Sequence, residues 1–485
     1  MMDNLKYRTI NGVLWSAAER ASNEVLRFVI VVMLARLLSP EQFGLVAMLA
    51  IFIGISQTFV NSGFGAALIQ KKNASQTDYS TVFYFNIIVG LFLFGILFCF
   101  APFIAAFYGE PQLVALTRFM GLTIVISSFG LIQNTLLTKK IDFKTQTTVN
   151  MIALSCSGII AIIMAWKGFG VWSLAVQAVS LDFFRTLLLW FFNSWRPTAE
   201  FSEKAFRSLF SYGSKLLAAS LLNTIFTNIY AVVIGKAFTT TDLGFYTQAN
   251  RLQRLPAQNV NSIVQRVTFP AFSSIQDENA RLKRGYKKAL KLLVFVNFPI
   301  MLGLIAVAKP LIGIVLTEKW MPAVPYLQLL CVVGSTYPIH SLNLNILQVK
   351  GRSDLFLKIQ IIDTAVIALA IVLTLPFGIL ALIIGQVMTS FVAYFINSYY
   401  SSRFIGYGLG EQVTDILPYL SAAIIMAVST ALIGFFWEDQ NMARLLFQIM
   451  SAIVVYSALS KIARLEAFEE MSIGFKAILL KTRLE

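Results

Sequence analysis

Long apolar segments alternate with short polar breaks along nearly the whole chain. Each segment is long enough to cross a hydrocarbon layer as a helix, which takes about 20 residues. The pattern therefore predicts an all-α polytopic membrane protein with about fourteen transmembrane helices. The predicted spans lie near residues 11–37, 42–68, 79–106, 112–137, 146–166, 170–192, 208–235, 243–270, 288–308, 323–349, 355–375, 378–401, 413–437 and 442–461.

The first span carries charged residues near its middle, where a side chain facing lipid would pay a large desolvation cost. Its polar residues recur at helical spacing and form one stripe on an otherwise apolar helix: Ser16, Arg20, Asn23, Glu24 and Arg27. A stripe of this kind must face protein or water. We therefore expect it to line an internal cavity.

The composition supports a membrane protein and argues against a large soluble enzyme, because 57% of the residues are apolar and only 13% are charged. The net charge of +15 resides mainly in alternate loops, which predicts cytoplasmic loops and cytoplasmic termini and gives no indication of nucleic-acid binding. The three cysteines lie in apolar segments without ligand spacing, so neither a metal site nor a disulfide framework is predicted.

The chain also repeats itself with a period of about 200 residues. The matching positions are Asn23, Gly44, Asn61 and Ser62 with Asn223, Gly244, Asn261 and Ser262. This predicts two six-helix lobes related as parallel repeats around a central cavity, whose access alternates as the lobes rock. The predicted division is an N-lobe at 1–200, a C-lobe at 201–405, two further helices at 406–462 and a cytoplasmic amphipathic tail at 463–485.

The eighth span carries the second polar stripe of the chain. Its members step by three and four residues along nearly the whole helix: Arg251, Arg254, Gln258, Asn261 and Gln265. The spans contain more basic than acidic residues, and arginine binds phosphate through a planar fork. A cavity lined by such residues predicts an anionic substrate, such as a phosphate or pyrophosphate head group.

Acidic residues within spans have two interpretations. Arg20 with Glu24 and Asp182 with Arg185 are neighbours on a helix face and can form internal ion pairs. Buried carboxylates can instead bind a coupling H⁺ or Na⁺, for which the candidates are Glu24, Asp182 and Asp363. No cofactor is predicted, and His340, the single histidine, is interpreted as a packed helix residue.

Several short stretches resemble the polysaccharide flippase family of the multidrug/oligosaccharidyl-lipid/polysaccharide exporter superfamily, and are most similar to its colanic-acid-exporter branch. They are Ala35-Arg36 with Gln42 to Leu45, Gly63 to Gly65 with Ile69-Gln70, Arg266-Val267 with Phe269 to Phe272 and Ile275 to Asp277, Glu318 to Trp320, and Leu327 to Gly334. The resemblance implies two lobes, a cationic central cavity and a bacterial inner-membrane flippase for a polyprenyl-pyrophosphate-linked oligosaccharide, used in surface polysaccharide or lipopolysaccharide biosynthesis. It implies membrane lipids and other polysaccharide assembly proteins as partners.

Combining the stripes with this resemblance assigns two groups of candidate residues. Pyrophosphate is expected to bind Arg251 and Arg254, with Arg27 and Arg20 as further candidates. Sugars are expected to bind the amides Asn23, Asn223, Gln258 and Asn261. The charged residues of the first span do not belong to the motifs that carry the resemblance.

Other functions remain open at this point. A cation or drug antiporter of the same superfamily would need a net acidic cavity, whereas arginine predominates here. A membrane-embedded polysaccharide polymerase or ligase would need a sizeable outer loop with catalytic groups, and the longest predicted outer loop has about a dozen residues. A structural scaffold would give no reason for the buried charges.

Overall fold

The computed structural model describes residues 22–61, 63–437 and 441–472, and all regular structure in this part of the chain is helical. Eleven of its helices are long and apolar enough to cross a membrane, so the chain is a multi-pass membrane protein. Large apolar side chains such as Phe92, Phe103 and Val372 are well exposed on these helices, as lipid-facing residues are.

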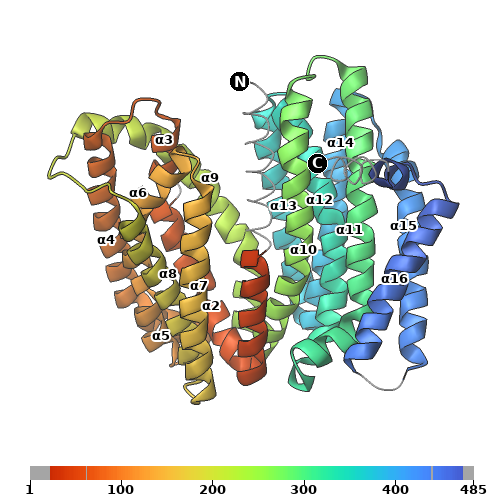
Figure 1. Ribbon diagram of the computed structural model, residues 1–485, viewed down its shortest axis with the longest axis horizontal. Coiled ribbons are helices and arrows are strands. Elements are labelled where there is room, and N and C mark those ends of the chain that lie inside the picture. Colours follow the sequence, from red (N-terminus) through yellow and green to blue (C-terminus); the bar gives the residue numbers. More distant parts are fainter. Residues whose placement is uncertain (1–21, 62, 438–440, 473–485) are drawn as a thin grey trace, which may run out of the picture. The chain divides into compact units, whose positions relative to one another are not determined.

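The chain divides into two compact units, and within each unit the long helices run side by side (Figure 1). The first unit ends at Gly244. It contains a helix over 22–37 and the helices α2 (Pro40–Asn61), α3 (Phe64–Gln70), α4 (Gln76–Tyr108), α5 (Leu113–Met120), α6 (Leu122–Lys139), α7 (Phe143–Trp166), α8 (Val171–Phe192) and α9 (Glu203–Ala237).

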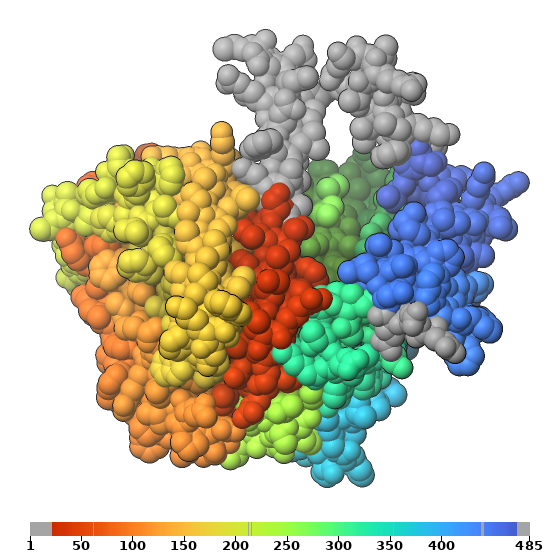
Figure 2. All heavy atoms as spheres, turned by 60° about the horizontal axis from the view of Figure 1, so that its bottom comes forward, coloured from red at the N-terminus to blue at the C-terminus, as the bar shows by residue number. Residues whose placement is uncertain are grey.

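The second unit begins at Phe245, within α10 (Thr240–Ser273). It continues with α11 (Asn279–Val315), α12 (Ala323–Val349), α13 (Ser353–Thr374), α14 (Ile379–Ile405), α15 (Leu409–Phe435) and α16 (Met442–Ile462), and with short 3₁₀ turns at Glu318–Trp320 and Leu375–Phe377. On the face shown in Figure 2, side chains of neighbouring helices within each unit lie against one another.

The described helices coincide with the predicted spans, with three differences. The spans predicted at 42–68 and 112–137 are each made of two helices, α2 with α3 and α5 with α6. The helices α10 and α12 are more polar and are not among the eleven helices that are apolar enough to cross a membrane. The first span is described only from residue 22, so the number fourteen stays a prediction.

The helix α9, predicted to begin the second lobe, packs against α2, α3 and α4 of the first unit.

The sequence repeat is also a structural repeat at the starts of α2 and α10. In the first copy the Ser39 backbone N–H donates to Gln42 Oε1 at 3.0 Å, and the Gln42 N–H donates to Ser39 Oγ at 3.4 Å. In the second copy Thr239 Oγ1 donates to Asp242 Oδ2 at 2.7 Å, and the Asp242 N–H donates to Thr239 Oγ1 at 3.1 Å. Both starts are thus fixed by reciprocal side-chain capping, which satisfies amide groups that a helix leaves free.

The repeated glycines bring these two helix starts into backbone contact. A Cβ atom on Gly44 would lie 1.8 Å from the carbonyl oxygen of Thr240, and one on Gly244 would lie 1.9 Å from that of Pro40. No other residue leaves room for this reciprocal contact. The predicted pair of glycines therefore has a packing role in the first unit.

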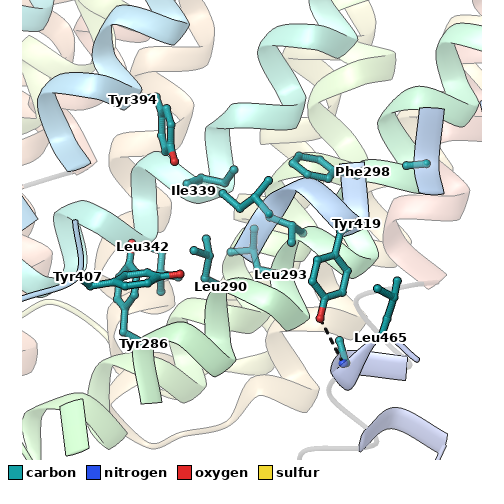
Figure 3. Packing of buried hydrophobic residues seen from close by; sticks show 14 of the residues in the cluster. Tyr286, Leu290, Leu293, Phe298, Ile339, Leu342, Tyr394, Tyr407, Tyr419 and Leu465 are labelled. Carbon is teal, nitrogen blue, oxygen red and sulfur yellow. Dashed lines mark hydrogen bonds between the residues drawn. The ribbon is translucent and has the colours of Figure 1, made fainter. Parts of the chain in front are cut away.

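The second unit has a large buried core on α11, and Figure 3 shows Leu290, Leu293 and Phe298 of this helix packed among residues from neighbouring helices. Next to them lies a buried hydrogen-bond network. Asn343 Oδ1 accepts from the Tyr286 hydroxyl at 2.7 Å and from Ser401 Oγ at 2.6 Å. The network joins α11, α12 and α14 with its polar groups satisfied inside the core.

One end of α11 is held to α15 by ion pairs. Lys287 Nζ lies 2.9 Å from Asp415 Oδ2, and Lys291 Nζ lies 3.5 Å from Asp415 Oδ1. The buried Tyr407 hydroxyl donates to Asp415 at 2.7 Å, and burial raises the pKa of Tyr407, which keeps this donor protonated.

The described start of the predicted amphipathic tail packs against the same region. Leu465 is buried in the core of the second unit, and the Ala467 N–H donates to the Tyr419 hydroxyl, as Figure 3 shows. Lys291 and Lys288 pair with Glu466 and Glu470, each at 2.8 Å. Residues 473–485 of the predicted tail lie outside the described residues.

The glycine contact generates the first prediction. Gly44→Ala should force the backbones of α2 and α10 apart and lower the thermal unfolding temperature of the detergent-purified protein by a few degrees, corresponding to about 1–3 kcal/mol. Gly95→Ala in α4 is the matched control, because a Cβ there meets nothing within 4 Å. It should leave stability unchanged or raise it slightly. Equal unfolding temperatures for the two variants would contradict the packing role of Gly44.

Candidate functional site

A polar cavity lies inside the first unit. It has a volume of about 270 Å³ and lies between α2, α6, α7 and α8. Its lining is mostly polar: Gln57, Asn61, Ser127, Gly130, Leu131, Asn134, Asn150, Asp182, Arg185, Thr186 and Leu189. Polar side chains from four membrane helices thus converge on one space.

The cavity contains an ion pair that the sequence predicts. Arg185 Nη1 lies 3.6 Å from Asp182 Oδ1, one helical turn away on α8. This distance neutralises the charges but is too long for a hydrogen bond. The buried Arg185 Nε has no hydrogen-bond partner among the described residues. Both charged groups therefore keep hydrogen-bonding capacity.

Amide side chains around the pair are also unused. The side chains of Gln57, Asn61 and Asn150 form no hydrogen bond within residues 22–61, 63–437 and 441–472. Asn134 is the exception, because its Oδ1 accepts from Gln146 Nε2 at 3.1 Å. A cavity wall with this many free donors and acceptors can hold a hydrogen-bonding ligand or water.

The polar stripe of the first span is described in part. Asn23 and Glu24 are half-buried, and Asn23 Oδ1 and Glu24 Oε2 are buried without a partner in the described chain. Arg27 is exposed. Arg20 lies outside the described residues, so its predicted pairing with Glu24 stays a prediction.

The stripe on α10 belongs to the second unit and has two kinds of member. Gln265 Nε2 donates to Ser341 Oγ at 2.7 Å, so this end of the stripe packs on α12. Arg251 and Arg254 are half-buried, and Arg254 forms no ion pair with any described residue. Gln258 is exposed, and Asn261 has a buried Oδ1 without a described partner.

The remaining candidates are scattered. Asn223 on α9 is exposed, and its carbonyl accepts from Thr227 Oγ1. Asp363 on α13 is half-buried, and its Oδ1 has no hydrogen-bond partner in the part of the chain that the structure describes. His340 on α12 lies against Tyr394, with ring centroids 6.4 Å apart, as expected for a packed residue.

Sequence reasoning missed most of the cavity lining in the first unit. Gln57 lies four residues before Asn61 on α2, which is a detectable helical pair. Asn134 and Asn150 are single amides in apolar spans and carry no pattern of their own. Groups of acidic, His or Cys residues able to hold a metal ion are absent from the described residues.

Comparison with known proteins identifies the family. A model of the polysaccharide biosynthesis protein family matches residues 33–325. The chain belongs to this family. It is 28% identical to the lipopolysaccharide biosynthesis protein WzxC of Escherichia coli over 81% of both chains. It is also 28% identical to the teichuronic acid biosynthesis protein TuaB of Bacillus subtilis, over 73% of this chain and 74% of that one.

Solved structures show the same fold. The lipid II flippase MurJ, in an inward closed conformation, matches with a TM-score of 0.77 at 16% identity and covers 93% of this chain and 98% of its own. An inward-facing multidrug transporter of the MOP superfamily matches with a TM-score of 0.60 at 16% identity, over 79% of this chain and 95% of its own. The predicted family and fold are confirmed.

The ion pair generates the second prediction. Asp182→Asn and Arg185→Gln should each cost stability by leaving one charge of the membrane-embedded pair uncompensated. The double variant should cost less than the sum, with a coupling free energy on the order of 1 kcal/mol. Thermal unfolding of the four proteins measures it. Additive losses would show that the two side chains do not interact.

Proposed function

We propose that the protein is a flippase that moves polyprenyl-pyrophosphate-linked oligosaccharide units from the cytoplasmic to the outer leaflet of the bacterial inner membrane. The observation that carries the proposal is the combination of family and fold: a polysaccharide biosynthesis protein with the architecture of a lipid II flippase. Both termini lie in the cytoplasm, as the loop charges indicate.

The pyrophosphate binds to arginines of α10, with those of the first helix as further contacts. Arg254 supports this role because it is half-buried in a membrane helix and forms no ion pair with a described residue. A guanidinium in such a place needs an anion, and its planar fork matches phosphate oxygens. Arg251 lies one turn earlier on the same helix, and Arg27 and Arg20 supply further positive charge.

The sugars hydrogen-bond to amide side chains, and the polyprenyl tail stays in the surrounding lipid. The amides are Asn23, Asn223, Gln258 and Asn261. Asn23 and Asn261 support this assignment best, because each has a buried oxygen without a described partner. No covalent bond is made or broken in this process, so the protein acts as a transporter and not as an enzyme.

An H⁺ or Na⁺ gradient drives the cycle through a carboxylate. Glu24 and Asp363 suit this role because each has a buried carboxylate oxygen without a described partner. Asp182 suits it less, since Arg185 already compensates its charge at 3.6 Å. Other polysaccharide assembly proteins deliver the substrate and receive it after transport.

The arginine assignment is tested by export of surface polysaccharide from cells whose own copy is replaced. Arg251→Ala combined with Arg254→Ala should reduce export at least tenfold, because the pyrophosphate loses its charged hydrogen bonds. Membrane abundance should not fall, since neither change creates a cavity in an apolar core. Arg266→Ala is the matched control, an exposed arginine on the same helix, and should export normally. Normal export by the double variant would contradict the site.

A further inference from the structure

The cavity of the first unit has the properties of a binding site for an uncharged, hydroxyl-rich ligand. We infer that it receives one sugar ring of the transported oligosaccharide. This inference rests on the proposed function, because it names a part of the same substrate and a place where that part binds. The cavity residues on α2, α6, α7 and α8 are separate from the polar stripes to which pyrophosphate and sugar contacts are assigned above.

The charged groups of the cavity lining cancel and so favour neither a cation nor an anion. Asp182 and Arg185 are the two charged groups of its lining, and they neutralise each other at 3.6 Å. The attraction of either ion to one member of the pair is offset by repulsion from the other member. The rest of the lining contributes amides, hydroxyls and apolar groups. A ligand that suits this wall is polar but carries no net charge.

Part of the hydrogen-bonding capacity of the cavity lining is unused. Gln57 and Asn150 have no described partner, and neither does the buried Nε of Arg185. Each carboxamide offers both donors and an acceptor, whereas a carboxylate only accepts and a guanidinium only donates. A ring with several hydroxyl groups can satisfy all of these at once, because each hydroxyl both donates and accepts.

The size of the cavity and its apolar lining residues fit a ring of this kind. The volume of about 270 Å³ is near the lower end of the roughly 300–1,000 Å³ of small-molecule sites and far above the ~30 Å³ of one water. Gly130, Leu131 and Leu189 contribute apolar surface to the lining. Apolar surface of this kind can pack against the C–H groups of a sugar while the amides bind its hydroxyls.

This arrangement also implies selectivity for the glycan. A site whose polar groups need hydroxyl partners rejects a ligand that lacks them, because the unpaired groups then stay desolvated. Binding in this cavity therefore discriminates by the pattern of hydroxyls, whereas the arginines read a pyrophosphate common to all substrates of this kind.

The test measures binding of a lipid-free probe to the full-length protein in lipid nanodiscs. The probe is the repeat-unit oligosaccharide released by mild acid from the carrier lipid of the host strain, and calorimetry gives its Kd. Gln57→Leu combined with Asn150→Leu should raise the Kd about tenfold, since two amide hydrogen bonds are lost. The same variant should unfold at the wild-type temperature or higher, because neither amide has a partner to lose.

A matched control comes from the same unit. Asn86 on α4 is buried, both its side-chain polar atoms lack a described partner, and it does not line the cavity. Asn86→Leu should bind the probe as the wild type does. Equal Kd values for the cavity variant and this control, or no binding of the probe to the wild type, would overturn the sugar site.

Failure of this site and failure of the flippase function give different results. In proteoliposomes, the wild type should move the lipid-linked oligosaccharide between leaflets, as measured by access of an impermeant lectin. If movement occurs while the cavity variant keeps the wild-type Kd, the cavity assignment alone is wrong. If the probe binds in the predicted way but no movement occurs, the cavity assignment holds and the flippase function is wrong.

Discussion

Every polar group placed inside a membrane-spanning helix must find a partner, because lipid offers none. This constraint decides which faces of the helices pack inward. In the second unit Asn343 gathers the hydroxyls of Tyr286 and Ser401 from two other helices. In the first unit Asp182 and Arg185 neutralise each other on one helix.

Individual clusters of polar side chains meet this constraint to different degrees. The Asn343 network is buried and fully used, and Asp415 likewise holds two lysines and a tyrosine hydroxyl. Such networks fix the packing of α11, α12, α14 and α15. The cavity beside Asp182 instead leaves amides and a guanidinium nitrogen unused. Polar groups that are hydrogen-bonded within the protein stabilise its packing, whereas polar groups without a partner at a cavity are available to bind a ligand.

The sequence predicts the features that depend on local pattern. Apolar periodicity places the spans, and the 200-residue offset identifies Gly44 and Gly244. In the structure each of these glycines lies against a backbone carbonyl at the start of the other helix. The spacing of Asp182 and Arg185 predicts their ion pair. Each of these signals is contained in one helix or in one repeated segment.

Features that depend on packing between helices cannot be predicted from such local patterns in the sequence. Asn134 and Asn150 line one cavity although each is a lone amide in an apolar span. The breaks between α2 and α3 and between α5 and α6 interrupt segments that are continuous in hydropathy. The start of the C-terminal tail has the spacing of an amphipathic helix, but its Leu465 packs into the core of the second unit.

The direction of transport is tested most directly by the leaflet position of the substrate in cells that lack the protein. An impermeant glycan probe is applied to spheroplasts, and lysed spheroplasts give the total amount of lipid-linked oligosaccharide. A flippase predicts single repeat units that accumulate out of reach of the probe, on the cytoplasmic side. Unpolymerised units that accumulate on the outer face would contradict it and would place the protein after transport, as a polymerase or ligase.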